Sequence, residues 1–401
     1  MKKIFIRLLY LLVIIPSYLN AQDTITINSE NYKNYLDLSR QYYKEYRYRQ
    51  AIALLEKLHS FDTTNVQVTN QLGEFYLNFN NKSKAVYYLE KTLTQDSLNL
   101  YALLSLGDFY LREGSIPVAQ ECYERVIAYI DSNNYYAYRQ IATIYHSMGG
   151  NFLPLAVDYY KKALKSNPYD LPSYSKLGNI FNLTDQSRLA DSICNVGLKI
   201  DSTNSNLLNI KGYALYNMKL YLETINTFEK VFQKKDTSAF NLKYTGLAYL
   251  SMNDFEKSKH FMELCVEYDS TDYEPFVVLG QLYLQTKEFE KGIACLDRAE
   301  KVNYPPAYKW SEMFKIKADI YNQLNRWEEA MECYQQGYKL NPKDITLVCK
   351  MAYQYDYLKQ REKAINYYTQ VIENADSLKF PGEVKLAKDR LQKLQVAKGR
   401  K

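Results

Sequence analysis

The apolar and polar positions of this chain repeat along most of its length. A small residue flanked by apolar ones recurs every 34 residues at Gly178, Gly212, Gly246 and Gly280. Around each of them, large apolar side chains fall three and four positions apart, which places them on one face of an α-helix. A fixed period of this length indicates a solenoid of helical repeats, so the pattern predicts an all-α fold.

A second small residue follows the first by 12 positions in nearly every copy, and by 14 in one copy. The pairs are Ser39/Ala51, Gly73/Ala85, Gly107/Ala119, Ala142/Ala156, Gly178/Ala190, Gly212/Thr224, Gly246/Ser258, Gly280/Gly292, Ala318/Ala330 and Ala352/Ala364. Two antiparallel helices joined by a short turn approach most closely where both side chains are small. Close packing there offsets the cost of about 1 kcal/mol for a glycine inside a helix. Each pair therefore predicts one helix–turn–helix hairpin, with the small residues at its contact point.

Large residues complete each copy at fixed places. An aromatic residue or leucine stands three positions after the first small residue, as at Tyr76 and Tyr110, and another large residue stands four positions after the second, as at Leu89 and Tyr123. This arrangement resembles the tetratricopeptide-repeat (TPR) family over residues 32–378, in about ten copies. The resemblance implies a right-handed superhelical solenoid in which the first helix of each copy lines a concave groove.

The regular pattern is interrupted at two places and ends before the C-terminus. The turn at 146–156 is longer than the others, and two prolines at 302–310 cannot continue a helix. Residues 379–401 combine an amphipathic apolar pattern with many Lys and Arg residues. They predict a C-terminal capping helix and a basic tail.

The N-terminus differs from the repeats. Basic residues precede a short apolar run that ends near Ala21, which predicts a signal peptide over 1–21 and a linker over 22–31. Its removal lowers Lys+Arg from 51 to 48 against 45 Asp+Glu, so the net charge falls from +6 to +3. That charge is too small and too evenly mixed to indicate nucleic-acid binding, and no later apolar run predicts a transmembrane segment. We therefore expect export to the periplasm, the cell envelope or the extracellular space of a bacterium.

The sequence carries no recognisable catalytic or metal-binding pattern. His59, His146 and His260 have no further ligand at a suitable spacing, and no nucleophile elbow or phosphate-binding loop occurs. We expect no cofactor, no metal and no enzyme activity. The six cysteines form no C-x-x-C pair and are expected to be mostly buried free thiols. A disulfide between Cys333 and Cys349, on neighbouring helices in an oxidising compartment, is the alternative hypothesis.

The face that the resemblance assigns to the groove is rich in amides, tyrosines and cations. In the middle copies it comprises Arg139, Gln140, His146, Lys176, Asn179, Asn182, Asn209, Tyr213, Tyr216, Lys243 and Tyr244. Amides can bond an extended peptide backbone, tyrosines offer flat contact area, and cations favour carboxylates. We interpret the chain as a non-enzymatic scaffold or adaptor that binds a protein or peptide partner in this groove. A glycan- or nutrient-binding protein at the outer membrane is the alternative.

Overall fold

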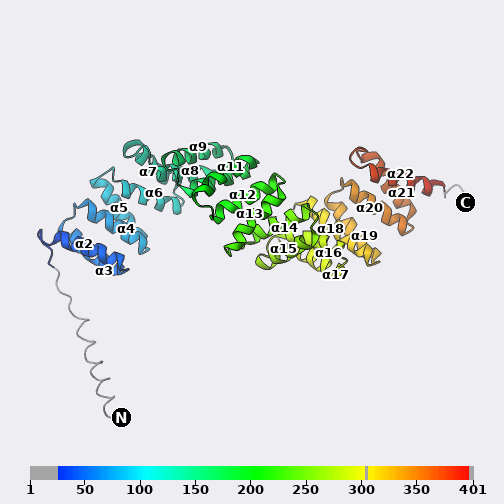
Figure 1. Ribbon diagram of the computed structural model, residues 1–401, viewed down its shortest axis with the longest axis horizontal. Coiled ribbons are helices and arrows are strands. Elements are labelled where there is room, and N and C mark those ends of the chain that lie inside the picture. Colours follow the sequence, from blue (N-terminus) through cyan, green and yellow to red (C-terminus); the bar gives the residue numbers. More distant parts are fainter. Residues whose placement is uncertain (1–25, 303–305, 397–401) are drawn as a thin grey trace, which may run out of the picture. The chain divides into compact units, whose positions relative to one another are not determined.

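Helices make up the regular structure of the chain (Figure 1). The computed structural model describes residues 26–302 and 306–396, which form 21 α-helices and no strand. This confirms the prediction of an all-α fold built from about ten helical hairpins and a final extra helix. The predicted signal peptide at 1–21, residues 22–25 of the predicted linker and the last residues of the basic tail lie outside the described ranges.

The chain divides into two compact units, residues 1–176 and 177–401. The first unit contains α2 (Tyr32–Lys44), α3 (Tyr48–Phe61), α4 (Val66–Asn78), α5 (Lys82–Gln95), α6 (Leu100–Arg112), α7 (Ile116–Tyr129), α8 (Tyr135–Met148) and α9 (Leu153–Ser166). The division falls within α10 (Leu171–Leu183). The second unit continues with α11 (Ser187–Ile200), α12 (Ser205–Asn217), α13 (Tyr221–Gln233), α14 (Ala239–Ser251), α15 (Phe255–Tyr268), α16 (Tyr273–Gln285), α17 (Phe289–Lys301), α18 (Ala307–Gln323), α19 (Trp327–Leu340), α20 (Ile345–Tyr357), α21 (Arg361–Asn374) and α22 (Pro381–Val396).

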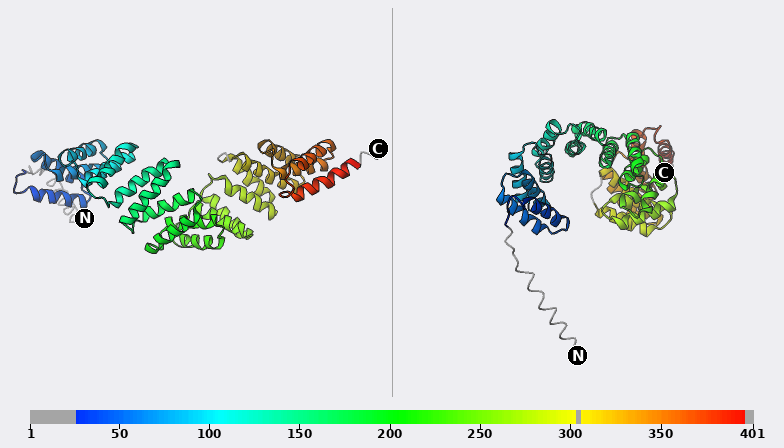
Figure 2. Two further views of the ribbon diagram at one scale, coloured as in Figure 1. Left: turned by 90° about the horizontal axis from the view of Figure 1, so that it is seen from above. Right: turned by 60° about the vertical axis from the view of Figure 1, so that its left-hand side comes forward.

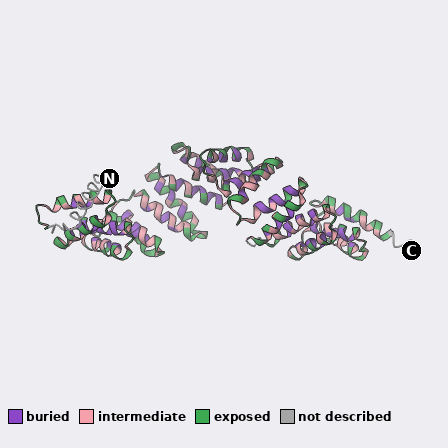
Figure 3. Cartoon of the chain, turned by 90° about the horizontal axis from the view of Figure 1, so that it is seen from below, coloured by how far each residue is buried: buried purple, intermediate pink, exposed green. Residues whose placement is uncertain are grey.

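We call the even-numbered helices from α2 to α20 first helices and the odd-numbered ones second helices. First helices pack most closely on the second helix that follows, as α4 does on α5 and α18 on α19. Weaker contacts join a second helix to the next first helix, as α19 to α20. Figure 2 shows helices of each unit lying side by side, and Figure 3 shows buried residues where helices face one another. The core of each unit is therefore a continuous layer between consecutive helices.

Glycine in a first helix makes room for a large side chain of the second helix. A Cβ added to Gly73 would lie 2.5 Å from Cγ of Leu89, and one added to Gly107 would lie 2.7 Å from Cε1 of Tyr123. Both large side chains are fully buried. The contact between the two helices is thus confirmed at the glycines. The nearest atoms belong to the large residue 16 positions on, however, and not to the small residue 12 positions on that the sequence pattern suggested.

The loops between hairpins use two polar residues to begin the next helix. The Asp96 carboxylate accepts a hydrogen bond from the backbone N–H of Leu98 at 3.3 Å, and the side chain of Asn99 then accepts from the N–H of Ala102 at 3.1 Å. The same arrangement recurs at Asp131/Asn134, Asp201/Asn204 and Asp269/Asp272. The Asp shapes the loop, and the helix N-cap is the residue three positions later.

Tyrosines join consecutive hairpins, which gives a structural role to some of the 41 tyrosines among the 401 residues of the chain. The Tyr283 hydroxyl on α16 donates to Glu263 on α15 at 2.6 Å, and Lys291 lies 5.7 Å from the centre of the same ring. Tyr110 on α6 likewise donates to Glu90 on α5 at 3.0 Å. A tyrosine therefore packs its ring in the seam between repeats while its hydroxyl reaches an acid of the preceding second helix.

The two irregular stretches have different structures. In 146–156 a single 3₁₀ turn, Gly150–Phe152, lies between α8 and α9, and Gly149 and Gly150 both have positive φ. Within 302–310, residues 303–305 lie outside the described ranges. The helix that follows, α18, has 17 residues, whereas α16 and α20 have 13 each.

The last helix, α22, packs on α20 and α21. Ala387 is fully buried on its inner side, and Lys388 is exposed beside it. No helix in the described ranges is long and apolar enough to cross a membrane.

All six cysteines are free thiols in the structure, and five of them are buried. The hypothesised disulfide between Cys333 and Cys349 is therefore wrong for this structure. Burial raises the pKa of each of these two thiols to about 11, because a thiolate loses its hydration inside the core. They act as small apolar groups at the contacts between helices.

Candidate partner-binding face

The predicted residue Arg139 links consecutive hairpins of the first unit. Its guanidinium pairs with Asp170, whose side chain is only 4% exposed, and lies 4.9 Å from the ring centre of Tyr136. Asp170 immediately precedes α10, so the ion pair ties α8 to the start of the next hairpin. The charge of Arg139 is thus already balanced within the chain.

Gln140 belongs to a polar network centred on Asp108. The Asp108 carboxylate accepts hydrogen bonds from the hydroxyls of Tyr123 at 2.6 Å and Tyr136 at 2.5 Å, and from the amide of Gln140 at 2.9 Å. Burial, followed by these bonds to Asp108, raises the pKa of both tyrosines well above their usual value. The network connects α6, α7 and α8 and uses the Gln140 amide for packing of the repeats.

The side-chain polar groups of His146 and Lys176 form no hydrogen bond or ion pair with any described residue. His146 is half-buried, and burial, followed by the charge of Lys176, lowers its pKa below the usual 6.5. Its imidazole is therefore neutral at pH 7. Lys176 is exposed and forms no ion pair with any described residue. These two are the predicted residues of the first unit that are best placed to meet a partner.

Three predicted asparagines lie in the second unit or at its start, and they differ in exposure. Asn179 is exposed, whereas Asn182 is buried and donates to the backbone oxygen of Ile210 at 3.0 Å. The side-chain oxygens of Asn182 and Asn209 are buried without a hydrogen-bond partner. Asn179 is therefore the asparagine of this group whose side chain reaches solvent.

Predicted tyrosines of α12 and α14 form one aromatic cluster. We name it the central aromatic cluster, and it consists of Tyr213, Tyr216, Phe240 and Tyr244. The Tyr244 ring centre lies 4.8 Å from that of Tyr213 and 5.2 Å from that of Tyr216, at angles of 67° and 61°. Phe240, which the sequence analysis did not select, is 41% exposed. Three of these rings are among the residues predicted from the sequence, whereas Phe240, which is open to solvent, is not.

Lys243 resembles Arg139 in being paired with acids of the next repeat. Its ammonium group lies 2.8 Å from Asp272 and 3.0 Å from Glu274, and its side chain is 17% exposed. Burial alone would lower its pKa, but the hydrogen bonds that its ammonium group donates to Asp272 and Glu274 outweigh burial and raise the pKa well above the usual value. Lys243 therefore carries a charge that the chain itself neutralises.

Other cations on first helices also pair with acids of a neighbouring repeat. Lys315 of α18 lies 3.2 Å from Asp344 of the next repeat, and Lys350 of α20 lies 2.5 Å from Asp319 of the preceding one. These acids are about 30 residues away in the sequence. Much of the expected positive charge of this face is thus cancelled between repeats.

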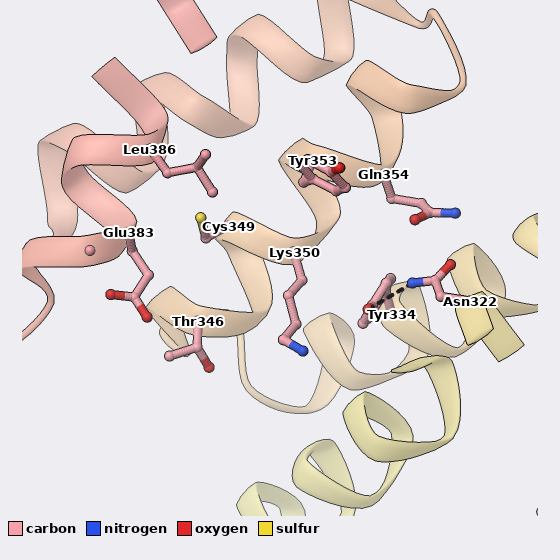
Figure 4. A pocket seen from close by; sticks show the side chains of 10 residues that line it. Asn322, Tyr334, Thr346, Cys349, Lys350, Tyr353, Gln354, Glu383 and Leu386 are labelled. Carbon is pink, nitrogen blue, oxygen red and sulfur yellow. Dashed lines mark hydrogen bonds between the residues drawn. The ribbon is translucent and has the colours of Figure 1, made fainter. Parts of the chain in front are cut away.

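A cavity of about 480 Å³ lies at the C-terminal end of the second unit (Figure 4). We name it the C-terminal cavity, and its lining residues are Asn322, Tyr334, Thr346, Cys349, Lys350, Tyr353, Gln354, Gly382, Glu383 and Leu386. Most of them lie on α18, α20 and α22, the same series of helices that carries the central aromatic cluster. Its volume is within the usual range for a pocket that binds a small group.

Sequence reasoning missed this cavity because no repeated pattern marks it. Figure 4 shows Leu386 and Glu383 of α22 on one side and Tyr353 and Gln354 of α20 on the other. Gly382, at the start of α22, also lines the cavity, and an added Cβ there would meet nothing within 4 Å.

The described residues contain no group of three His, Cys, Asp or Glu side chains arranged to hold a metal ion. The fold and the first-helix face define an α-solenoid of stacked helical hairpins. Comparison with models of protein families shows which kind of helical repeat the chain contains. Models described as tetratricopeptide repeat match residues 246–272, 273–304 and 350–377, and a TPR repeat model matches 318–355. These matches confirm the resemblance to the tetratricopeptide-repeat family over residues 246–304 and 318–377.

Curated relatives match part of the chain at low identity. The peroxisomal targeting signal receptor of Saccharomyces cerevisiae is 22% identical over 192 residues, which are 46% of this chain and 31% of that protein. Anaphase-promoting complex subunit 3 of Schizosaccharomyces pombe is 20% identical over 209 residues, 52% of this chain and 31% of that protein. The chain thus spans about a third of the length of these relatives.

Among solved structures, the C-terminal part of a TPR repeat-containing protein from Cytophaga hutchinsonii shares the fold. Its TM-score is 0.51 at 17% sequence identity, and the match covers 61% of this chain and 99% of that one.

Proposed function

We propose that this chain is a non-enzymatic scaffold whose first helices bind a segment of a partner protein. The observation that carries the proposal is the central aromatic cluster, which gathers four rings on first helices and leaves Phe240 41% exposed. Aromatic rings that remain partly open to solvent are common anchors in protein interfaces. Relatives named as a targeting-signal receptor and as a subunit of a multiprotein complex support recognition of proteins.

The proposal includes export from a bacterial cell into the periplasm, the cell envelope or the medium. It rests on the basic and apolar segments that precede Ala21. The test is the N-terminal sequence of the chain recovered from a periplasmic fraction. A chain that begins after Ala21 would support export, and a cytoplasmic chain that retains Met1 would contradict it.

Binding at the first helices can be tested by site-specific photo-crosslinking in the native envelope. A photoreactive phenylalanine analogue replaces Tyr353 on α20 or Phe240 on α14, and in a matched control it replaces Tyr268 on α15. Tyr353 and Tyr268 are 51% and 59% exposed, so the control differs in its helix and not in its accessibility. We expect one defined protein adduct at Tyr353 or Phe240 and none at Tyr268.

Adducts of equal strength at all three positions, or only at Tyr268, would contradict binding by the first helices. Charge variants are less suitable, because Arg139 and Lys243 hold repeats together and their removal would weaken the fold. Lys176→Ala and His146→Ala remove open polar groups without breaking an ion pair among described residues.

A glycan-binding protein is the second candidate, and the same chain tests it on a glycan array. Stacking on a sugar needs a flat and accessible ring face. In the central aromatic cluster the rings meet at 55–67°, so they cover part of one another. Specific retention of a glycan that Phe240→Ala abolishes would favour this candidate over the first.

A further inference from the structure

The C-terminal cavity has one charge that is not balanced. Lys350 donates to both carboxylate oxygens of Asp319, at 2.6 and 2.5 Å, so these two charges cancel. Glu383, half-buried in the first turn of α22, makes no hydrogen bond or ion pair with any described residue. The wall of the cavity therefore has a net negative charge, located on Glu383.

The same wall contains a polar group whose orientation is fixed by the protein. The amide nitrogen of Asn322 donates to the Tyr334 hydroxyl at 3.1 Å, and that hydroxyl donates to Asp319 at 2.6 Å. These two bonds fix the orientation of the amide, and its oxygen is buried with no partner. Because protein atoms cover this oxygen, a ligand in the cavity does not reach it, and the charged group left for a ligand is Glu383.

The rest of the wall is largely apolar and partly open. Leu386 and Tyr353, on α22 and α20, are 39% and 51% exposed, and Figure 4 shows them on either side of Cys349. Burial keeps Cys349 a neutral thiol, with its pKa raised to about 11. An aliphatic chain between Leu386 and Tyr353 would remove both from water.

We propose that the C-terminal cavity receives a lysine or arginine side chain from an extended segment of the partner protein. This inference rests on the proposed function and specifies the chemistry of the partner. The aliphatic part of such a side chain suits Leu386 and Tyr353, and its cationic end suits Glu383. A neutral apolar side chain would leave the Glu383 carboxylate without a partner, and an acidic side chain would be repelled.

The experiment uses the full mature chain and a display library of short random peptides. We expect the selected peptides to contain a Lys or Arg next to apolar residues. In fluorescence anisotropy, replacing that basic residue by norleucine should weaken binding about five-fold, the usual size of a partly exposed ion pair. Glu383→Gln should weaken binding of the basic peptide by the same factor and leave binding of the norleucine peptide unchanged.

Glu373→Gln is the matched control, because Glu373 is an exposed acid on α21 outside the cavity. It should bind the basic peptide as the unmodified chain does. If the selected peptides lack basic residues, or if Glu383→Gln binds them normally, the inference about the cavity is overturned while peptide binding by the scaffold stands. If the library yields no binding peptide, the proposed function fails with it.

The other occupant to consider is the basic end of the chain itself. Residues 397–401 contain Lys398, Arg400 and Lys401 and follow α22. Deleting them should leave the affinity for the basic peptide unchanged. A rise of several-fold in affinity after the deletion would mean that the tail competes for the cavity, and would overturn the assignment to a partner.

Discussion

Replacing Gly212 by alanine tests the packing principle of the hairpins. Gly212 lies in the middle of α12, where alanine would favour the helix by about 1 kcal/mol in the absence of other contacts. The added Cβ would lie 2.5, 2.6 and 2.9 Å from three ring atoms of Phe228 on α13. Phe228 is fully buried, so its ring cannot move out into solvent.

Overpacking of this kind typically costs about 1–3 kcal/mol, which exceeds the gain in helix propensity. We therefore expect Gly212→Ala to lower the free energy of unfolding by about 1 kcal/mol. Phe228→Leu should restore part of that loss, because it removes the ring atoms that the methyl group meets. The two changes should be coupled by about 1 kcal/mol, since they alter one contact.

Urea denaturation followed by circular dichroism measures the change, and amide hydrogen exchange locates it in α12 and α13. The local measurement is needed because a long array of repeats need not unfold in one step. Gly382→Ala is the control, because nothing lies within 4 Å of its added Cβ. If Gly212→Ala stabilises the chain as much as Gly382→Ala does, the packing explanation of the recurring glycines is refuted.

Four further predictions concern single residues. Lys287 has a φ of 63°, a left-handed conformation that glycine adopts more readily, so Lys287→Gly should stabilise the chain by about 1 kcal/mol. Lys161 lies inside α9, where glycine is unfavourable, so Lys161→Gly should destabilise the chain by a similar amount in the same urea assay. Tyr283→Phe removes the hydrogen bond to Glu263 and should lower the free energy of unfolding by about 1 kcal/mol, and an unchanged urea midpoint would show that the bond contributes nothing. Burial and the Lys91 ammonium group, 2.9 Å from Nε2, lower the pKa of His59, while Asp62 opposes them. The unfolded chain therefore binds a proton at His59 more readily than the folded chain does, so the free energy of unfolding should fall as the pH drops below 6.5. His59→Gln should reduce this pH dependence of the melting temperature. Finally, all six thiols should react with an alkylating agent after denaturation without reductant, and a mass that shows two unreacted cysteines would indicate a disulfide.

The hairpins could be predicted from the sequence because their pattern is local and repeated. Gly107 and Tyr123 are 16 residues apart, and one short turn is enough to bring them together. The N-cap residues are harder to identify from the sequence, because Asp96 and Asn99 are both suitable capping residues and only the loop geometry selects Asn99. Local patterns thus identify the element but not always the residue that makes a given bond.

The candidate site was harder to predict, because its properties depend on pairs of repeats. Arg139 and Lys243 have the composition of a binding face, yet the acids that neutralise them stand about 30 residues further on, at the start of the next hairpin. The C-terminal cavity is lined by residues of α18, α19, α20 and α22, which lie far apart in the sequence. No periodic pattern marks residues that meet in this way.

Comparison of equivalent positions explains why Lys176 is open when other cations are paired. Lys350 pairs with Asp319, the residue that follows the first small residue of the preceding repeat, and Asp108 holds the same place in its own repeat. In the repeat before Lys176 this place is occupied by Thr143, which donates to the backbone oxygen of Arg139 at 2.9 Å and contacts the Tyr160 hydroxyl at 3.1 Å. A threonine bonded in this way offers Lys176 no carboxylate. Most charges of this face cancel between repeats. Recognition of a partner would therefore depend on the few positions where a neighbouring repeat lacks the matching acid or cation. Lys176 is such a position, and a carboxylate of the partner could pair with it.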